Sequence, residues 1–113
     1  MKVSKTRMKI ALQVRDTACR IVRQIGTDTT IIDSRGDWHP TREAKIGGLL
    51  ILWSPRGNEQ LIDIWQGQKV FSISWSDSGP YVVAFRPGSW MSLILSVDKY
   101  GMKHALNTFR CLH

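Results

Sequence analysis

Residues 61–75, Leu-Ile-Asp-Ile-Trp-Gln-Gly-Gln-Lys-Val-Phe-Ser-Ile-Ser-Trp, carry the strongest structural signal in the sequence, because large apolar residues recur at every second position on both sides of a glycine. A two-residue type II′ turn at Gly67-Gln68 would join two antiparallel strands and pair Gln66 with Lys69. That register places four large apolar residues on one face, as the pairs Ile62 with Ile73 and Ile64 with Phe71. The turn chemistry and the alternation therefore predict the same β-hairpin independently.

Turn-forming segments on both sides extend this hairpin into a meander. Residues 54–58 have proline at the second turn position and glycine at a left-handed position, and residues 77–80 contain the sequence Asp-Ser-Gly-Pro. The strands that these turns would connect are residues 49–53, 60–66, 70–76 and 81–85. The middle of the chain is therefore predicted to form four antiparallel strands.

The segment between the N-terminal helix described below and this meander gives a weaker signal. Residues 27–34 are rich in β-branched side chains, which favours a further short strand. Residues 35–48 mix glycines, Pro40 and charged residues, so we expect an irregular connection with one helical turn around Arg42 to Lys45.

An amphipathic helix is predicted from about residue 6 to residue 25. At about 100° per residue, its apolar side chains fall within one narrow sector, which faces the core. These residues are Ala11, Val14, Ala18, Ile21, Val22 and Ile25. The opposite side carries Lys5, Lys9, Arg20 and Arg23, with Asp16 among them. Gly26 follows the last apolar residue, where a left-handed C-cap is expected.

Two more helices are expected near the C-terminus. The spacing of Trp90, Leu93, Ile94 and Val97 favours a helix with Ser89 as N-cap, although the alternation within residues 91–97 also fits a fifth strand. Residues Met102 to Leu112 have apolar side chains at helical spacing, and Gly101 separates the two segments. The predicted architecture is thus one α+β domain over residues 1–113: a basic amphipathic helix on a meander of four to five strands, closed by one or two C-terminal helices.

Length and composition exclude several classes of protein. The 113 residues are 42% hydrophobic and 22% charged, which is typical of one folded domain and not of a disordered chain. The longest apolar run, residues 49–53, is far shorter than the roughly 20 residues that a membrane span needs. Cys19 and Cys111 form no disulfide framework, so we expect reduced thiols in a cytoplasmic protein.

The positive charge is concentrated at the N-terminus. The formal net charge is +7, and the first 23 residues hold seven basic side chains against one acidic side chain. Clustered Lys and Arg on a rigid helix attract phosphates, although such a face can also be merely solvated. We therefore predict a non-enzymatic binding protein whose residues Lys5, Lys9, Arg20 and Arg23 engage nucleic acid or an acidic protein surface.

The five tryptophans suggest a second hypothesis. Trp53, Trp75 and Trp90 are expected to fill the core. In the hairpin register above, Trp65 instead lies on the polar face with Leu61 and Val70, and such an apolar patch is rarely left open in a monomer. This predicts an interface at Leu61, Trp65 and Val70, and with it a homodimer or a protein-interaction role as inhibitor or accessory factor.

A third hypothesis is a small basic nuclease. The loop from Asp33 to Glu43 is dense in polar residues and includes His39, an acid–base candidate. A second candidate cluster near the C-terminus comprises Lys99, His104, Arg110 and His113. No Gly-rich phosphate loop or paired-cysteine zinc pattern is present in the sequence, so we expect neither a cofactor nor a metal.

Overall fold

The computed structural model describes residues 3–105 and has an α+β fold. The elements in chain order are α1 (Lys5–Ile25), β1 (Thr27–Ile32), β2 (Trp38–Ile46), β3 (Leu49–Arg56), β4 (Glu59–Gln66), β5 (Gln68–Ser76), β6 (Gly79–Phe85) and α2 (Trp90–Tyr100). All strands belong to one antiparallel sheet in the order β1-β2-β3-β4-β5-β6. The predicted fold class is confirmed, with six strands in the meander where four to five were expected.

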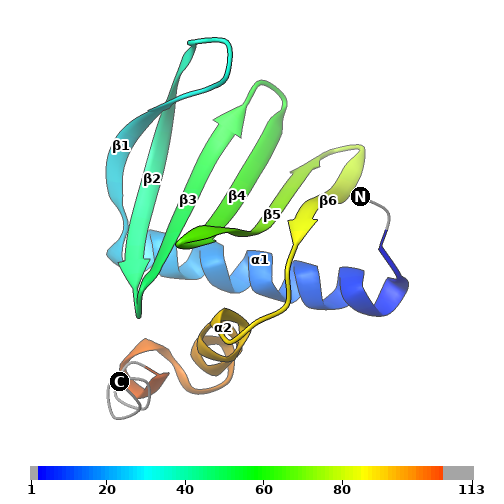
Figure 1. The fold of residues 1–113 in the computed structure, drawn as a ribbon, viewed down its shortest axis with the longest axis vertical. Coiled ribbons are helices and arrows are strands. Elements are labelled where there is room, and N and C mark those ends of the chain that lie inside the picture. The colour runs from blue at the N-terminus through cyan, green and yellow to red at the C-terminus, as the bar shows by residue number, and fades with distance from the viewer. Residues whose placement is uncertain (1–2, 106–113) are drawn as a thin grey trace.

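The two helices cover only part of the sheet. In Figure 1, α1 crosses the lower portion of the strands, α2 lies below it, and the upper ends of the strands extend beyond α1. Buried side chains of α1, α2 and the lower parts of the strands form one hydrophobic core. The helix-facing side of the sheet is therefore closed at one end and open at the other.

The β4–β5 hairpin confirms the predicted pairs and corrects the predicted turn. Ile62 lies opposite Ile73, and Ile64 lies opposite Phe71. The tip is tighter than expected, because Gln66 pairs with Gln68 around Gly67, which has a φ of 75°. A register shift between Ile64 and Trp65 compensates for the shorter turn and leaves Val70 without a direct partner on β4. The side chain of Val70 is only 6% exposed and packs in the core.

The expectation for residues 35–48 is wrong, because β2 occupies most of this segment. The helical turn expected from Arg42 to Lys45 is extended backbone paired with β1 and β3. The Asp33 N–H donates a hydrogen bond to the Asp37 carbonyl, so the backbone groups of every second residue of β2 from residue 37 point towards β1. The backbone nitrogen of Pro40 falls between these positions and points away from β1. On the other side, β3 pairs only with residues 42–46. Pro40 therefore interrupts no ladder hydrogen bond, which explains why a proline is tolerated here.

The helix α1 confirms the predicted apolar stripe except at Ile25, which is 41% exposed, and it begins at a polar cap. The Ser4 hydroxyl accepts a hydrogen bond of 3.2 Å from the Arg7 N–H. The helix ends differently from the prediction, because Gly26 has an extended φ of −73° instead of a left-handed one. A side chain at residue 26 would collide with the Val22 carbonyl oxygen, so close approach explains the glycine. Within residues 3–105, no helix is long and apolar enough to cross a membrane.

The C-terminal part confirms a helix for residues 90–97. In α2, Trp90 packs against Phe71 and Phe85 at ring distances of 5.7 and 6.2 Å, and its indole donates a 2.7 Å hydrogen bond to the Arg86 carbonyl. Gly101 has a φ of 87° and separates α2 from a helical turn at residues 102–105. The rest of the helix predicted up to residue 112 lies outside the described residues.

Candidate functional site

A hollow of about 290 Å³ lies between α1 and the open end of the sheet. It is lined by Arg15, Asp16, Cys19, Arg23, Trp53, Gln60 and Trp75, and we call it the arginine–tryptophan groove. Its residues come from α1, β3, β4 and β5, so only the folded chain brings them together.

The sheet side of the groove follows from the strand register. Trp53 lies opposite Ile62, and Gln60 lies opposite Trp75. Because side chains alternate between the faces, Trp53, Gln60 and Trp75 share the helix-facing side with the buried Ile62. The Trp53 indole donates a 2.9 Å hydrogen bond to the Gln60 carboxamide oxygen. This bond fixes the orientation of the Trp53 ring relative to Gln60.

Two arginines of α1 lie over these rings. The Arg23 guanidinium is 5.0 Å from the Trp53 ring centroid, and the Arg15 guanidinium is 5.1 Å from that of Trp75. Such stacking orients the planar group and leaves its N–H donors available. Arg15 also forms an ion pair of 2.9 Å with Asp16, whereas within residues 3–105 Arg23 has no ion-pair partner. The two guanidinium groups are thus held in place at the groove.

Cys19 forms part of the groove wall between these arginines. Burial raises the pKa of its thiol from 9.0 to about 11, although the nearby Arg23 and Arg15 act in the opposite direction. The side chain is therefore a neutral thiol at physiological pH and is poorly suited to act as a nucleophile.

A second hollow, of about 240 Å³, adjoins the groove. It is lined by Asp28, Thr29, Pro40, Thr41, Arg42, Trp53, Pro55 and Gln60. Trp53 and Gln60 belong to both hollows. At its far side, Arg42 is held by Asp28 at 2.9 Å and by the Gly26 carbonyl at 2.8 Å. A cationic hollow therefore lies next to one lined by an aromatic ring and prolines.

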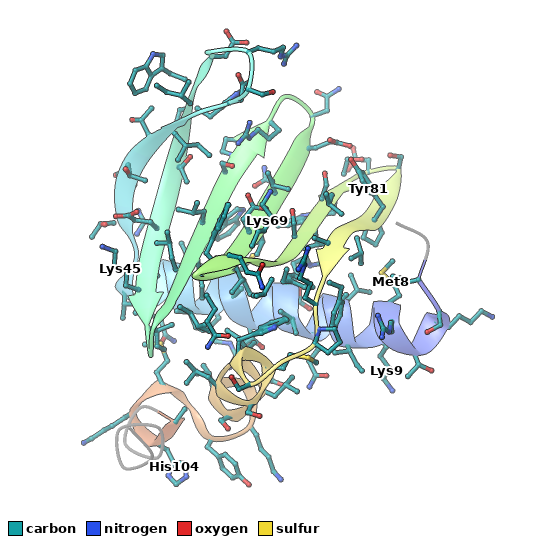
Figure 2. The ribbon with its side chains drawn as sticks, viewed as in Figure 1. Met8, Lys9, Lys45, Lys69, Tyr81 and His104 are labelled. Carbon is teal, nitrogen blue, oxygen red and sulfur yellow. The ribbon has the colours of Figure 1, made fainter. Side chains whose placement is uncertain are left out.

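The structure separates the four predicted binding residues on α1. All of them are exposed, and Figure 2 shows Lys9 on the side of α1 that points away from the sheet. Arg20 binds Asp98 of α2 at 3.0 Å, whereas Arg23 leans over β3. Of the predicted set, Arg23 alone lines the groove, and Lys5 and Lys9 form no ion pair within the described part of the chain.

The predicted interface residues also occupy different environments. Leu61 and Trp65 are half-buried, whereas Val70 lies in the core because of the shifted register. Lys69 lies 5.4 Å from the centre of the Trp65 ring. The buried indole nitrogen of Trp65 has no hydrogen-bond partner among the described residues. The interface hypothesis accordingly depends on Leu61 and Trp65, and it stays a prediction.

The candidate acid–base residues His39 and His104 line neither the groove nor the adjoining hollow, and they lie apart from one another (Figure 2). His39 contacts Asp33 at 2.7 Å near the β1–β2 turn, and the pKa of Asp33 falls from 3.8 to about 2 because of hydrogen bonds from His39 and the Asp37 N–H. His104 lies beyond α2 at the opposite end of the molecule (Figure 2). Lys99 lies over the Tyr100 ring, while Arg110 and His113 are outside the described residues.

Comparisons with protein-family models, curated proteins and solved structures found no match to this chain. Among residues 3–105, no group of three or more His, Cys, Asp or Glu side chains is arranged to hold a metal ion. The geometry of the groove is therefore the main evidence on function.

Sequence reasoning missed the groove because Trp53 and Trp75 were assigned to the core. Both are half-buried and contact core residues, so the assignment holds for only part of each ring. A usable signal was the position of Trp75 beside the 77–80 turn, at the end of a strand. Arg15 falls between the apolar and basic sectors of α1, and this edge position was a second signal.

Proposed function

We propose that this chain is a non-enzymatic binding protein for single-stranded nucleic acid, and that the arginine–tryptophan groove is the centre of its binding surface. The observation that carries the proposal is the stacking of Arg15 and Arg23 over Trp75 and Trp53. Single-strand binding sites characteristically combine cations that follow the backbone with aromatic rings that stack bases.

The spacing of the arginines favours a polymer over a small anion. Arg15 and Arg23 are eight residues apart on α1, which corresponds to about 12 Å along the helix axis. The rings beneath the two guanidinium groups belong to β3 and β5, about 10 Å apart in the sheet, so successive phosphates of one strand match them better than one small anion does. Lys5 and Lys9 continue the positive charge towards the start of α1. The helix as a whole holds six basic residues and one acidic residue, so it attracts an extended polyanion.

The adjoining hollow favours nucleic acid over an acidic protein. Trp53, Pro40 and Pro55 offer flat apolar surfaces, and the Gln60 carboxamide offers a hydrogen-bonding group. A base needs both kinds of contact, and its phosphate would lie on the cationic side of Trp53. Carboxylate side chains alone would use the arginines but would not fill this hollow.

The proposal is tested by fluorescence anisotropy with a labelled single-stranded oligonucleotide at about 50 and about 200 mM salt. Several phosphate contacts should weaken binding at least tenfold across this range. Arg23→Gln and Arg15→Gln should each weaken binding about tenfold and reduce the salt dependence by about one phosphate contact.

Arg20→Gln is the matched control, because it removes the same charge from the same helix. Arg20 does not line the groove and binds Asp98 of α2 instead, so its loss should leave affinity within about twofold. An equal loss for all three variants would mean that only net charge matters and would refute the groove as the site. Binding of polyglutamate as tight as that of the oligonucleotide would favour an acidic protein partner instead.

A further inference from the structure

The outer edge of β1 is a second feature that the groove does not explain. β1 forms one edge of the sheet (Figure 1), and its six residues carry one charged side chain, Asp28, at the second position. The opposite edge, β6, contains Pro80 and a register shift opposite Ser72 and Ile73, both of which hinder strand pairing. The β1 edge has neither protection.

The hydrogen-bond alternation shows which backbone groups of β1 are free for pairing. The Asp33 N–H bonds to the Asp37 carbonyl, so residues 31, 29 and 27 point towards β2 in the same way. The N–H and C=O groups of Asp28, Thr30 and Ile32 therefore point away from the sheet. Three such residues at alternating positions can pair with an added strand, and antiparallel pairing is the slightly more stable arrangement.

We propose that β1 pairs with β1 of a second copy of this chain about a twofold axis at Thr30. This register is the one in which all three outward residues of each copy take part: Thr30 lies opposite the partner's Thr30, and Ile32 lies opposite the partner's Asp28. The two sheets then form one continuous twelve-stranded sheet with both copies of α1 on the same face. The contact is isologous, so it closes at a dimer.

The exposed apolar side chains around β1 fit this arrangement. Ile32 and its cross-strand neighbour Trp38 are 53% and 66% exposed at one end of β1, and Ile25 is 41% exposed at the other end. Ile32 and Trp38 lie opposite each other and share one face of the sheet. Residue 38 is four residues before Arg42, which lies opposite the helix-facing Trp53, so this face is the helix-facing one. In the dimer, the twofold axis places Ile32 and Trp38 of each copy towards Ile25 of the other copy. The second copy therefore covers apolar surface that a monomer leaves exposed.

Disulfide trapping tests the register directly in a Cys111→Ser chain, where the other thiol, Cys19, is buried. Opposed Cα atoms in a hydrogen-bonded antiparallel pair are about 5.5 Å apart, within the range for a disulfide. Thr30→Cys should therefore form a covalent dimer under mild oxidation. Asp28→Cys should not, because the two copies of residue 28 lie on opposite sides of the axis. A mixture of Asp28→Cys and Ile32→Cys chains should cross-link to each other.

Sedimentation velocity of the unmodified chain gives an independent measurement. We expect a species of twice the mass of one chain at micromolar concentration. Thr30→Pro should give a monomer, because it removes an outward N–H without affecting the bonds to β2, and Thr30→Val should remain dimeric. A monomeric wild-type chain, equal cross-linking of Thr30→Cys and Asp28→Cys, or a folded Thr30→Pro dimer would each overturn the proposal. None of these results depends on nucleic-acid binding.

Discussion

Trp90 packs among other aromatic side chains in the core, whereas Trp53 and Trp75 lie at the edge of α1 beneath two of its arginines. Trp90 is 2% exposed among Phe71 and Phe85, and its indole N–H is satisfied by a carbonyl. Trp53 is half-buried and lies beneath Arg23. We call the core around Trp90, beneath α1 and α2, the covered region. We call the other end of the sheet, which carries Trp53, Trp75 and the β1–β2 hairpin, the open region. The comparison shows that the tryptophan of the covered region is enclosed by the fold, while those of the open region keep part of each ring exposed.

The largest expected difference between the regions is in stability. Trp90→Ala should lower the free energy of unfolding by about 3–5 kcal/mol, since it empties a well-packed site and leaves a cavity. Trp53→Ala removes a ring that already contacts solvent and should lower it by about 1–2 kcal/mol. Urea unfolding followed by circular dichroism measures both changes. Equal losses would show that the open region is part of the core and would remove the basis for the comparison.

Two neighbouring glycines at the β2–β3 turn sharpen the boundary of the covered region. Gly47 and Gly48 both have left-handed φ values, 56° and 81°, so alanine at either position should cost about 1–2 kcal/mol. At Gly47 an added Cβ would also lie 2.5 Å from the Leu93 side chain of α2, whereas at Gly48 it would meet nothing within 4 Å. Gly47→Ala should therefore be about 1–3 kcal/mol more destabilising than Gly48→Ala. Thermal unfolding of both variants provides the measurement, and equal midpoints would mean that α2 does not pack closely on this turn.

A smaller effect is expected for the arginines of the open region. Arg23→Gln should lower the free energy of unfolding by less than about 1 kcal/mol, because one exposed cation–π contact is weak. Oligonucleotide affinity should fall about tenfold in the same variant, as expected for a lost phosphate contact. Trp90→Ala should show the reverse pattern below its unfolding transition, with reduced stability and nearly unchanged affinity. If Arg23→Gln instead unfolded the protein, the arginine would be a structural element of the fold.

The covered region was largely predictable from sequence because its signals are local and repeated. The alternation in residues 61–75 specified the pairs of Ile62 and Ile64 with their partners, and the apolar stripe specified the buried side of α1. The turn at Gly67 was predicted one residue too long, because a β-bulge can shift the register without changing which face the flanking residues occupy. Patterns of period two and 3.6 thus predict which face of a strand or helix is buried more reliably than they predict the length of a turn.

The open region was not predictable in the same way, because its contacts join residues far apart in the chain. β2 has only a few buried apolar side chains, and Pro40 argues against a strand unless the end of β3 is known. The sequence predicts Arg23 as a binding residue, but its position over Trp53 depends on where α1 crosses the sheet. Trp53 appeared to be a core residue for the same reason. Sequence patterns show that a residue is apolar or charged, but they do not show which part of the sheet a helix covers.

The smallest expected effect concerns two carboxylates, one from each region, in acid. Hydrogen bonds lower the pKa of Asp33 to about 2, first from His39, and they lower the pKa of Asp98 below 3.8, first from Gln13 and then from Arg20. A carboxyl whose folded-state pKa is lowered stabilises the protein above its unfolded pKa, and this contribution is lost as the pH falls through the folded value. Stability should therefore decrease between about pH 4 and pH 2, and less steeply in Asp98→Asn.

Hydrogen exchange separates the two contributions to this acid effect. Asp98 joins α2 to α1, so its protonation should increase exchange across the covered region. Asp33 accepts hydrogen bonds from the N–H groups of Arg35 and Asp37, so Asp33→Asn should increase exchange in the β1–β2 hairpin. If Asp33→Asn instead increased exchange throughout α1 and α2, the hairpin and the covered region would unfold as one unit, and the boundary between the two regions would have no energetic meaning.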